Sequence, residues 1–435
     1  MTGHDPSSFI VIGTVTANIS FLSPCCVSDA DTDHTYGVEL ATNLAPTPSW
    51  LNLPSWYTAV EATRLTPVCH SRVKEVNDEV NSYFLENWPF PNSKSQKGFL
   101  GSDFTSCMCY NYPEALDDRI GVACRLITLL FLVDDLLDHM SLEDGRLYNK
   151  KVMALMKGDV LPDRSVAVEW MSYDIWAEMR ALDSRLAGEV VEPMADFMAA
   201  QTEKERLKKM GMEEYLEWRG RDVGASLVTA LGRFAMGLVM SAEELALVEP
   251  LDRIWFRHVS VMNDVWSYDK EVRQSQKSQE EGAVLRSSVA ILCEETQVAV
   301  QDPSSSLSHL LQPLLSHLLL LLHYLLGGPG KNKKLERRRS LLSVEDAKRI
   351  LTQRCRDWED EHKAVEKTVV AKRDSSAIRQ YIRGLEHQMS GNEIWSTTTL
   401  RYAAPSRQHA PSYCMAYLLP CLLSLFVLVL SSTRY

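Results

Sequence analysis

The sequence is poor in the residue types that mark disulfide scaffolds, zinc sites and low-complexity chains. Its ten cysteines are scattered over 435 residues, with no C-x-x-C pair and no histidines at zinc-binding spacing. This pattern favours reduced thiols and a cytoplasmic location over a disulfide-rich secreted protein. Glycine (20) and proline (18) are too scarce for a collagen-like or low-complexity chain, and no internal repeat is present.

Positive charge is also in short supply. The 57 acidic residues outnumber the 46 basic ones, which gives a net charge of -11. A nucleic-acid-binding surface is therefore not expected. A protein this acidic would need metal cations as intermediaries to hold an anionic substrate.

Strand-type alternation is nearly absent, whereas apolar residues recur at three- and four-residue steps over long stretches. These stretches are 116–140, 166–210, 211–240 and 242–272. The hydrophobic content of 45% is enough for a sizeable core. The sequence therefore predicts an all-α fold in a single domain.

A first acidic motif, D-D-x-x-D, follows the apolar run LITLLFLV. Asp134 and Asp138 are four residues apart and share one helix face, with Asp135 beside them. Like charges at this spacing repel, and a hard divalent cation such as Mg²⁺ would compensate them through carboxylate oxygens. The alternative interpretation is a solvated helix end.

A second motif, N-D-x-x-S-x-x-K-E, lies downstream. Asn263, Ser267 and Glu271 fall at i, i+4 and i+8, so their oxygens line one stripe of a helix. This set carries one negative charge and suits Mg²⁺ that also binds phosphate oxygens, which the adjacent Lys270 could reach as well.

An arginine upstream fits the same chemistry. Arg219 lies in W-R-G-R-D-V-G, where glycines inside a helical pattern predict a helix break. An arginine beside such a break is a plausible diphosphate contact, and the alternative is a surface arginine on an ordinary helix. Near the end, the pair Arg401-Tyr402 follows the last helical stretch and is uninformative by itself.

Together these motifs resemble class I terpene synthases, and within them the fungal aristolochene synthases, which are sesquiterpene cyclases. The stretches that carry the resemblance are LFLVDDLLDHMS, GDVLPDRS, YLEWRGRDVG, VMNDVWSYDKE and QMSGNEIWSTTTLRY. The resemblance extends from residue 69 to residue 402 with one interruption. A chain-elongating prenyltransferase would instead need a second D-D-x-x-D, and this chain has Asn263-Asp264 there.

The resemblance implies a helical terpenoid synthase barrel in which three Mg²⁺ ions hold farnesyl diphosphate and the chain is cyclised to a bicyclic, aristolochene-like hydrocarbon. It implies no obligatory protein partner and leaves a homodimer open. By position, it assigns metal binding to Asp134, Asp135, Asp138, Asn263, Ser267 and Glu271; diphosphate binding to Arg219, Lys270, Arg401 and Tyr402; and the cavity wall to Phe131, Phe197 and Trp395. For Phe131 and Phe197, core packing is the alternative.

One position departs from the family pattern. In C-Y-N-Y-P, Asn111 stands where the family has a cavity tyrosine. A polar amide among carbocations is expected to change the product or to add a water-quenching route.

Three segments fall outside the resemblance. They are a poorly ordered N-terminal extension (1–63), an insertion (298–341) and an apolar tail (403–435). The run 307–326 in the insertion and the run 415–430 in the tail carry no charge. Each of these two runs is open to three interpretations: membrane segment, long disordered loop, or sequence absent from the mature protein.

For the insertion, a membrane span would separate Arg401 from Asp134, although the site needs both. A retained intron is favoured, because codons for Val298 begin with GT and the arginine and serine codons before Leu341 can supply AG. A catalytically impaired homologue tethered to a membrane through its tail is the competing hypothesis.

Overall fold

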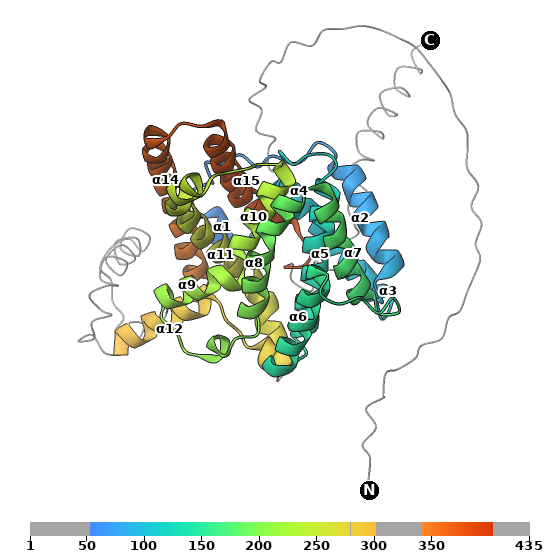
Figure 1. The fold of residues 1–435 in the computed structure, drawn as a ribbon. Helices are drawn as coiled ribbons and strands as arrows, with labels where there is room; N and C mark the ends of the chain where they lie inside the picture. Colours follow the sequence, from blue (N-terminus) through green and yellow to red (C-terminus); the bar gives the residue numbers. More distant parts are fainter. Residues whose placement is uncertain (1–52, 279, 302–341, 403–435) are drawn as a thin grey trace, which may run out of the picture. The chain divides into compact units, whose positions relative to one another are not determined.

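Helices make up the regular structure of the part of the chain that the computed structural model describes, residues 53–278, 280–301 and 342–402, in which no strand occurs. All of these residues fall within one compact unit. In chain order the α-helices are α1 (Ser55–Thr58), α2 (Val73–Asn87), α3 (Ser93–Ser102), α4 (Phe104–Asn111), α5 (Ile120–Leu137), α6 (Leu142–Lys157), α7 (Ala167–Leu182), α8 (Ser184–Ala200), α9 (Met212–Asp222), α10 (Ala225–Met236), α11 (Ala242–Lys277), α12 (Ser288–Gln301), α14 (Val344–Lys372) and α15 (Ser376–Thr398), with short 3₁₀ turns η1 (Lys204–Leu207) and η2 (Glu281–Ala283) (Figure 1). The predicted all-α fold is confirmed.

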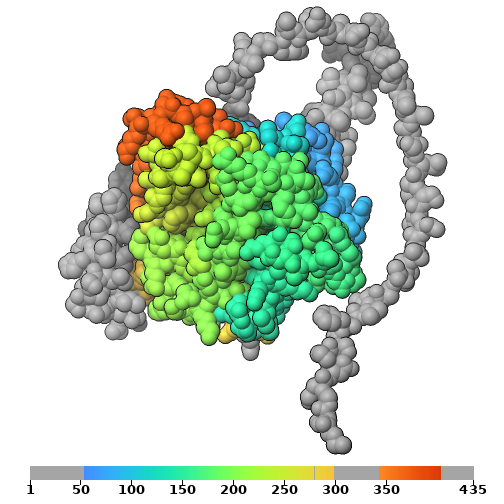
Figure 2. All heavy atoms as spheres, viewed as in Figure 1, coloured from blue at the N-terminus to red at the C-terminus, as the bar shows by residue number. Residues whose placement is uncertain are grey.

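α5 forms the interior of one half of the unit. Its sequence is apolar on nearly every side, so it is buried all round by α2, α4, α7 and α10. Figure 2 shows that side chains fill the spaces between the neighbouring ribbons of α6, α8 and α10. The acidic motif stands at the end of α5, where the helix leaves this core.

α11 is the longest helix and packs along α14 and α15. It begins with a capping box in which the Ser241 hydroxyl accepts from the Glu244 backbone N–H and the Glu244 carboxylate accepts from the Ser241 N–H. Because the helix continues unbroken to Lys277, it holds the second motif in a fixed register over two turns.

A glycine sets the distance between α4 and α15. A Cβ on Gly391 would lie 2.8 Å from the main-chain carbonyl of Tyr110, closer than side chains tolerate. The backbones can therefore approach only with glycine at this position, and this approach places Trp395 of α15 against α4. The indole N–H of Trp395 donates to the carbonyl of Asp103 at 3.0 Å.

The start of the described chain differs from the predicted boundary at residue 63. α1 lies within the predicted extension, yet Trp56 is buried and its ring lies 5.1 Å from that of Trp266. The Tyr57 hydroxyl donates to Glu393 at 2.5 Å. A four-residue helix with little periodicity gives no sequence pattern, so these contacts could not be predicted.

The predicted insertion, residues 298–341, lies mostly outside the described residues, as do the runs 307–326 and 415–430. α12 continues to Gln301, and α14 begins again at Val344 and packs against α12. Among the described helices, none is long and apolar enough to cross a membrane.

Candidate active site

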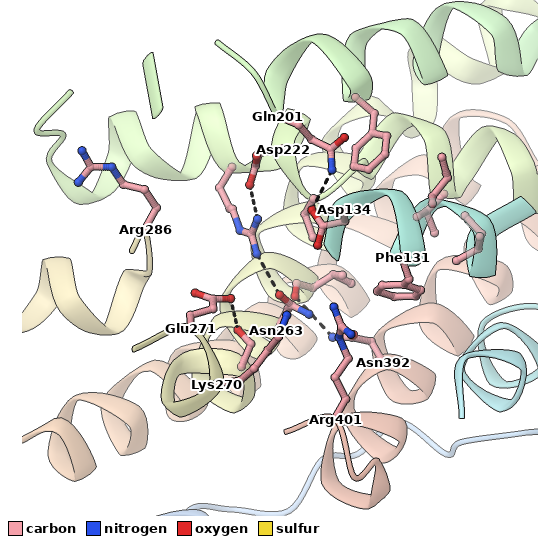
Figure 3. A pocket seen from close by; sticks show the side chains of 18 of the residues that line it. Phe131, Asp134, Gln201, Asp222, Asn263, Lys270, Glu271, Arg286, Asn392 and Arg401 are labelled. Atoms are coloured by element: carbon pink, nitrogen blue, oxygen red, sulfur yellow. Dashed lines mark hydrogen bonds and ion pairs between the residues drawn. The ribbon is translucent and has the colours of Figure 1, made fainter. Parts of the chain in front are cut away.

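A pocket lies between α4, α5, α8, α9, α10, α11 and α15 (Figure 3). One part of its wall is apolar, with side chains such as Met108, Ile127, Leu130 and Val228. The other part is polar and contains most of the residues that the sequence assigned to metal and diphosphate. Of the assigned residues, the pocket is lined by Asn111, Phe131, Asp134, Asp138, Phe197, Arg219, Asn263, Ser267, Lys270, Glu271, Trp395, Arg401 and Tyr402.

The first acidic motif is divided between two environments. Asp134 and Asp138 face the pocket, and Asp134 accepts a hydrogen bond from the Gln201 amide at 3.0 Å. Burial, together with the charge of Asp134, raises the pKa of Asp138 to about 7. The pKa of Asp134 is raised as well, chiefly by burial. These two carboxylates therefore share a buried site in which the protein's own cations do not offset burial and their mutual repulsion.

Asp135 points to the basic residues instead. It accepts two hydrogen bonds from Arg401, at 2.7 and 3.1 Å, and lies 3.6 Å from the Lys270 ammonium. Burial opposes its ionisation, but the two cations outweigh burial and lower the pKa of Asp135 to about 2. In this state Asp135 anchors two of the predicted diphosphate donors.

The second motif lies across the pocket from Asp134 (Figure 3). Asn263, Ser267 and Glu271 all line the pocket from one stripe of α11. The Ser267 hydroxyl donates to Glu271 at 2.6 Å, and burial raises the pKa of the Glu271 carboxyl. The Asn263 amide donates to the Tyr402 hydroxyl at 2.9 Å. All three side chains thus carry oxygens on the same wall of the pocket, as a shared ligand set requires.

Arg219 stands in the last turn of α9, directly before the predicted helix break. The break is present: Gly224 has a φ of 73°, in the left-handed region that favours glycine, and α10 begins after it. Arg219 donates to the side-chain amide oxygen (Oδ1) of Asn263 at 2.9 Å and to the Asp264 carboxylate at 3.2 Å, and it pairs with Asp222. The guanidinium is thereby held at the edge of the second motif.

Aromatic rings form the wall beside Arg401. Phe131 stacks on Phe104 with centroids 4.4 Å apart, and the ring of Trp395 lies 5.4 Å from that of Tyr402. The guanidinium of Arg401 lies over Phe104 and Phe131 at 5.2 and 5.5 Å. The sequence analysis did not assign Phe104 to this wall, because no spacing within the chain indicates that α4 meets α5 at this point.

Asn111 is buried in the same pocket. Its amide N–H₂ donates to the carbonyl of Cys107 at 3.0 Å, one turn earlier in α4. This local bond fixes the side chain, so a polar group is held among apolar neighbours.

The oxygen-rich pocket suits a hard divalent cation, which prefers carboxylate, amide and hydroxyl oxygens. A second buried cluster of His258, Glu359 and Glu393 does not. There Arg356 donates to Glu359 at 2.7 Å and to Glu393 at 2.8 Å, so an arginine already occupies the space between the carboxylates. This cluster joins α11, α14 and α15 as a structural ion network.

Comparison with known proteins agrees with the geometry. Residues 125–310 match a family profile described as terpene synthase family 2, C-terminal metal binding. A (+)-aristolochene synthase from Penicillium expansum is 44% identical over 342 residues, which cover 78% of this chain and 90% of that protein. An aristolochene synthase from Aspergillus terreus is 42% identical over 338 residues, covering 78% of this chain and 92% of that protein.

The chain belongs to the aristolochene synthase family of terpene synthases. The crystal structure of aristolochene synthase from Penicillium roqueforti matches with a TM-score of 0.61 and 40% identity, over 78% of this chain and 99% of that one. The match confirms the predicted class I terpenoid synthase fold. The matched profile is a metal-binding one and spans both acidic motifs, so this member of the aristolochene synthase family uses divalent metal.

Six polar residues that line the pocket were not assigned by the sequence analysis: Gln201, Arg206, Asp222, Gln274, Arg286 and Asn392. Gln201 follows α8 directly, whereas the two arginines lie in η1 and in the connection before α12. Polar residues in such connections are common, and nothing in their spacing relates them to the motifs on α5 and α11.

Proposed function

We propose that this protein is a Mg²⁺-dependent sesquiterpene cyclase that ionises farnesyl diphosphate and closes the released chain to a bicyclic, aristolochene-like hydrocarbon. The observation that carries the proposal is the union of both acidic motifs, four basic or hydroxyl donors and an apolar wall in one pocket. A polyprenyl diphosphate has the same division into a charged head and an apolar chain. The two relatives named aristolochene synthase support the same reaction, since the alignment with this chain covers about nine tenths of each.

Asp134 and Asp138 on one side, and Asn263, Ser267 and Glu271 on the other, would hold the metal, with three ions expected. Bound Mg²⁺ supplies Lewis-acid stabilisation of the diphosphate oxygens. Arg219, Lys270, Arg401 and Tyr402 would donate hydrogen bonds to the same anion. Asn263 contacts Arg219 and Tyr402, and Asp135 contacts Lys270 and Arg401. These contacts hold the donors in place before substrate arrives, so little reorganisation accompanies binding.

The apolar wall would fold the farnesyl chain and exclude water while the cation cyclises. Phe131, Phe197 and Trp395 present ring faces that stabilise cations by about 2 kcal/mol where water is excluded. No separate basic side chain is required, since the released diphosphate can accept protons. Asn111 is the residue most suited to divert the route, because its amide can hold a water molecule near a cation.

The reaction is tested with purified protein, farnesyl diphosphate and Mg²⁺, with volatile products analysed by gas chromatography and mass spectrometry. We expect a bicyclic C15 hydrocarbon. Asn263→Ala and Asp134→Ala should each reduce turnover at least about 100-fold, the effect typical of losing a metal ligand or its support. Glu249→Ala, an exposed residue earlier in α11, is the matched control. Near-normal turnover by either ligand variant contradicts the assigned roles.

The segments outside the family pattern need their own experiment. We infer that 298–341 is a retained intron and that 403–435 is extra sequence of similar origin. Sequencing the spliced transcript tests the intron, and a transcript that keeps codons 298–341 refutes it. Turnover is also compared between the full-length protein and a variant that lacks both segments. If only the deletion variant is active, the result supports the alternative of a membrane-tethered, impaired full chain.

A further inference from the structure

Two arginines at the edge of the pocket have no place in the proposed mechanism. Arg206 lies in η1, and Arg286 lies between η2 and α12, yet both line the same pocket. Figure 3 shows Arg286 well apart from Arg401, on the other side of the second motif. Arg286 is therefore separate from the donors near Arg401.

The two arginines are fixed against each other. The Arg286 side chain donates through Nε to the main-chain carbonyl of Arg206 at 2.5 Å. Arg206 donates to Asp222 at 3.1 Å and to the carbonyl of Gly282 at 3.2 Å. The Nε of Arg206 is buried and has no hydrogen-bond partner within the described residues. Arg286 is thus held by the main chain of Arg206, and the Arg206 guanidinium has donor capacity left over.

The two arginines differ in the negative charge around them. Arg286 forms no ion pair with any carboxylate in the described part of the chain, and the nearby Glu294 pairs instead with Lys209 at 3.4 Å. Asp222, the partner of Arg206, also pairs with Arg219. Burial and the positive charge of Arg206 lower the pKa of Arg286. Two like charges at a partly buried site are unfavourable unless an anion joins them.

The position of Arg206 indicates which anion. It lines a small pocket together with Asp134 and Asp138, so it adjoins the first acidic motif. Arg286 brings a second positive charge to the same pocket, apart from Arg401 (Figure 3). Guanidinium groups match the geometry of phosphate oxygens.

We propose that Arg206 and Arg286 form a rim subsite that binds the diphosphate group of the substrate as it enters and inorganic diphosphate as it leaves. This proposal rests on the proposed function and adds two residues to it. The subsite raises the local concentration of the anion and lowers KM, whereas ionisation depends on the donors around Arg219 and Arg401.

The test compares Arg286→Gln and Arg286→Lys with wild type. Isothermal titration calorimetry with inorganic diphosphate at fixed Mg²⁺ gives Kd, and turnover of farnesyl diphosphate gives KM and kcat. Arg257→Gln is the control, because Arg257 lies on α11, pairs with Glu213 at 2.9 Å and does not line the pocket. Thermal unfolding of each variant checks that the fold is retained.

We expect Arg286→Gln to raise both Kd and KM about tenfold, the scale of one lost charge-assisted bond, with kcat within about twofold of wild type. Arg286→Lys should recover most of the loss because it keeps the charge, and Arg257→Gln should match wild type. A Kd within twofold of wild type in Arg286→Gln, or a fall in kcat with unchanged Kd, overturns the subsite. Absence of turnover by the wild type would refute the proposed function instead, and the Kd comparison would still decide the subsite.

Discussion

Gly282 is the position where a single methyl group should disturb the pocket most directly. η2 packs against the end of α5, and the Gly282 N–H donates to the carbonyl of Met140 at 3.3 Å. A Cβ at Gly282 would lie only 2.2 Å from the main-chain oxygen of Leu137, the residue next to Asp138. Ordinary contact begins near 3.4 Å, so Gly282→Ala must push the two backbones apart by about 1.2 Å.

This displacement has two expected consequences. Overpacking of a backbone contact typically lowers the free energy of unfolding by about 1–3 kcal/mol. The same movement shifts Asp138 and the carbonyl that holds Arg206, so metal-dependent turnover should fall as well. Urea denaturation measures the first effect, and turnover of farnesyl diphosphate measures the second.

Gly188 provides the matched control. It lies inside α8, and a Cβ there meets no atom within 4 Å. Gly188→Ala should therefore stabilise the protein by up to about 1 kcal/mol through helix propensity, without loss of turnover. If Gly282→Ala unfolds and turns over as the wild type does, the contact between η2 and α5 does not support the site and the reasoning is wrong.

Three further predictions concern stability, the ion network and the product. His362 is fully buried, its ring nitrogens lack hydrogen-bond partners among the described residues, and burial lowers its pKa to about 3. Because the unfolded chain takes up the proton near pH 6.5, the free energy of unfolding should fall as the pH drops below that value, by about 2 kcal/mol at pH 5 relative to pH 8. His362→Leu should remove this loss. If urea denaturation gives parallel pH profiles for the variant and the wild type, the prediction is wrong. Arg356→Met leaves buried carboxylates unpaired and should lower the free energy of unfolding by about 3–5 kcal/mol. Arg354→Ala breaks an exposed ion pair and should lower it by less than about 1 kcal/mol. Equal unfolding midpoints for the two variants would refute this distinction. Asn111→Leu should reduce any oxygenated products relative to hydrocarbon in gas chromatography, and an unchanged product profile would show that the amide does not act on the cations.

Local pattern was sufficient for the helices that carry the chemistry. The apolar run before Asp134 predicts a buried helix with carboxylates at its end, and α5 has this form. The i, i+4, i+8 spacing places Asn263, Ser267 and Glu271 on one stripe of α11. The glycines after Arg219 predict a helix break, and Gly224 provides it. These features depend on helix geometry within a few turns, which the sequence encodes directly.

Contacts between distant segments could not be obtained in this way. Asp135 and Arg401 are 266 positions apart, and nothing in either motif indicates that this carboxylate binds the arginine while its neighbours face the pocket. The stacking of Phe104 on Phe131 depends on how α4 crosses α5. Such pairings arise from the packing of whole helices, so no local spacing reveals them.

The sequence by itself determined the helical class and the register of the proposed oxygen ligands, because 3.6 residues per turn translate spacing into a common face. It also determined the reaction class, through motifs whose chemistry is carried by residue type. Only the tertiary structure decided which groups share a charge environment: Asp138 beside Asp134, Asp135 beside Arg401, and Arg206 beside Arg286. Protonation and ion pairing follow distance and burial, and these are properties of the packed chain rather than of its order.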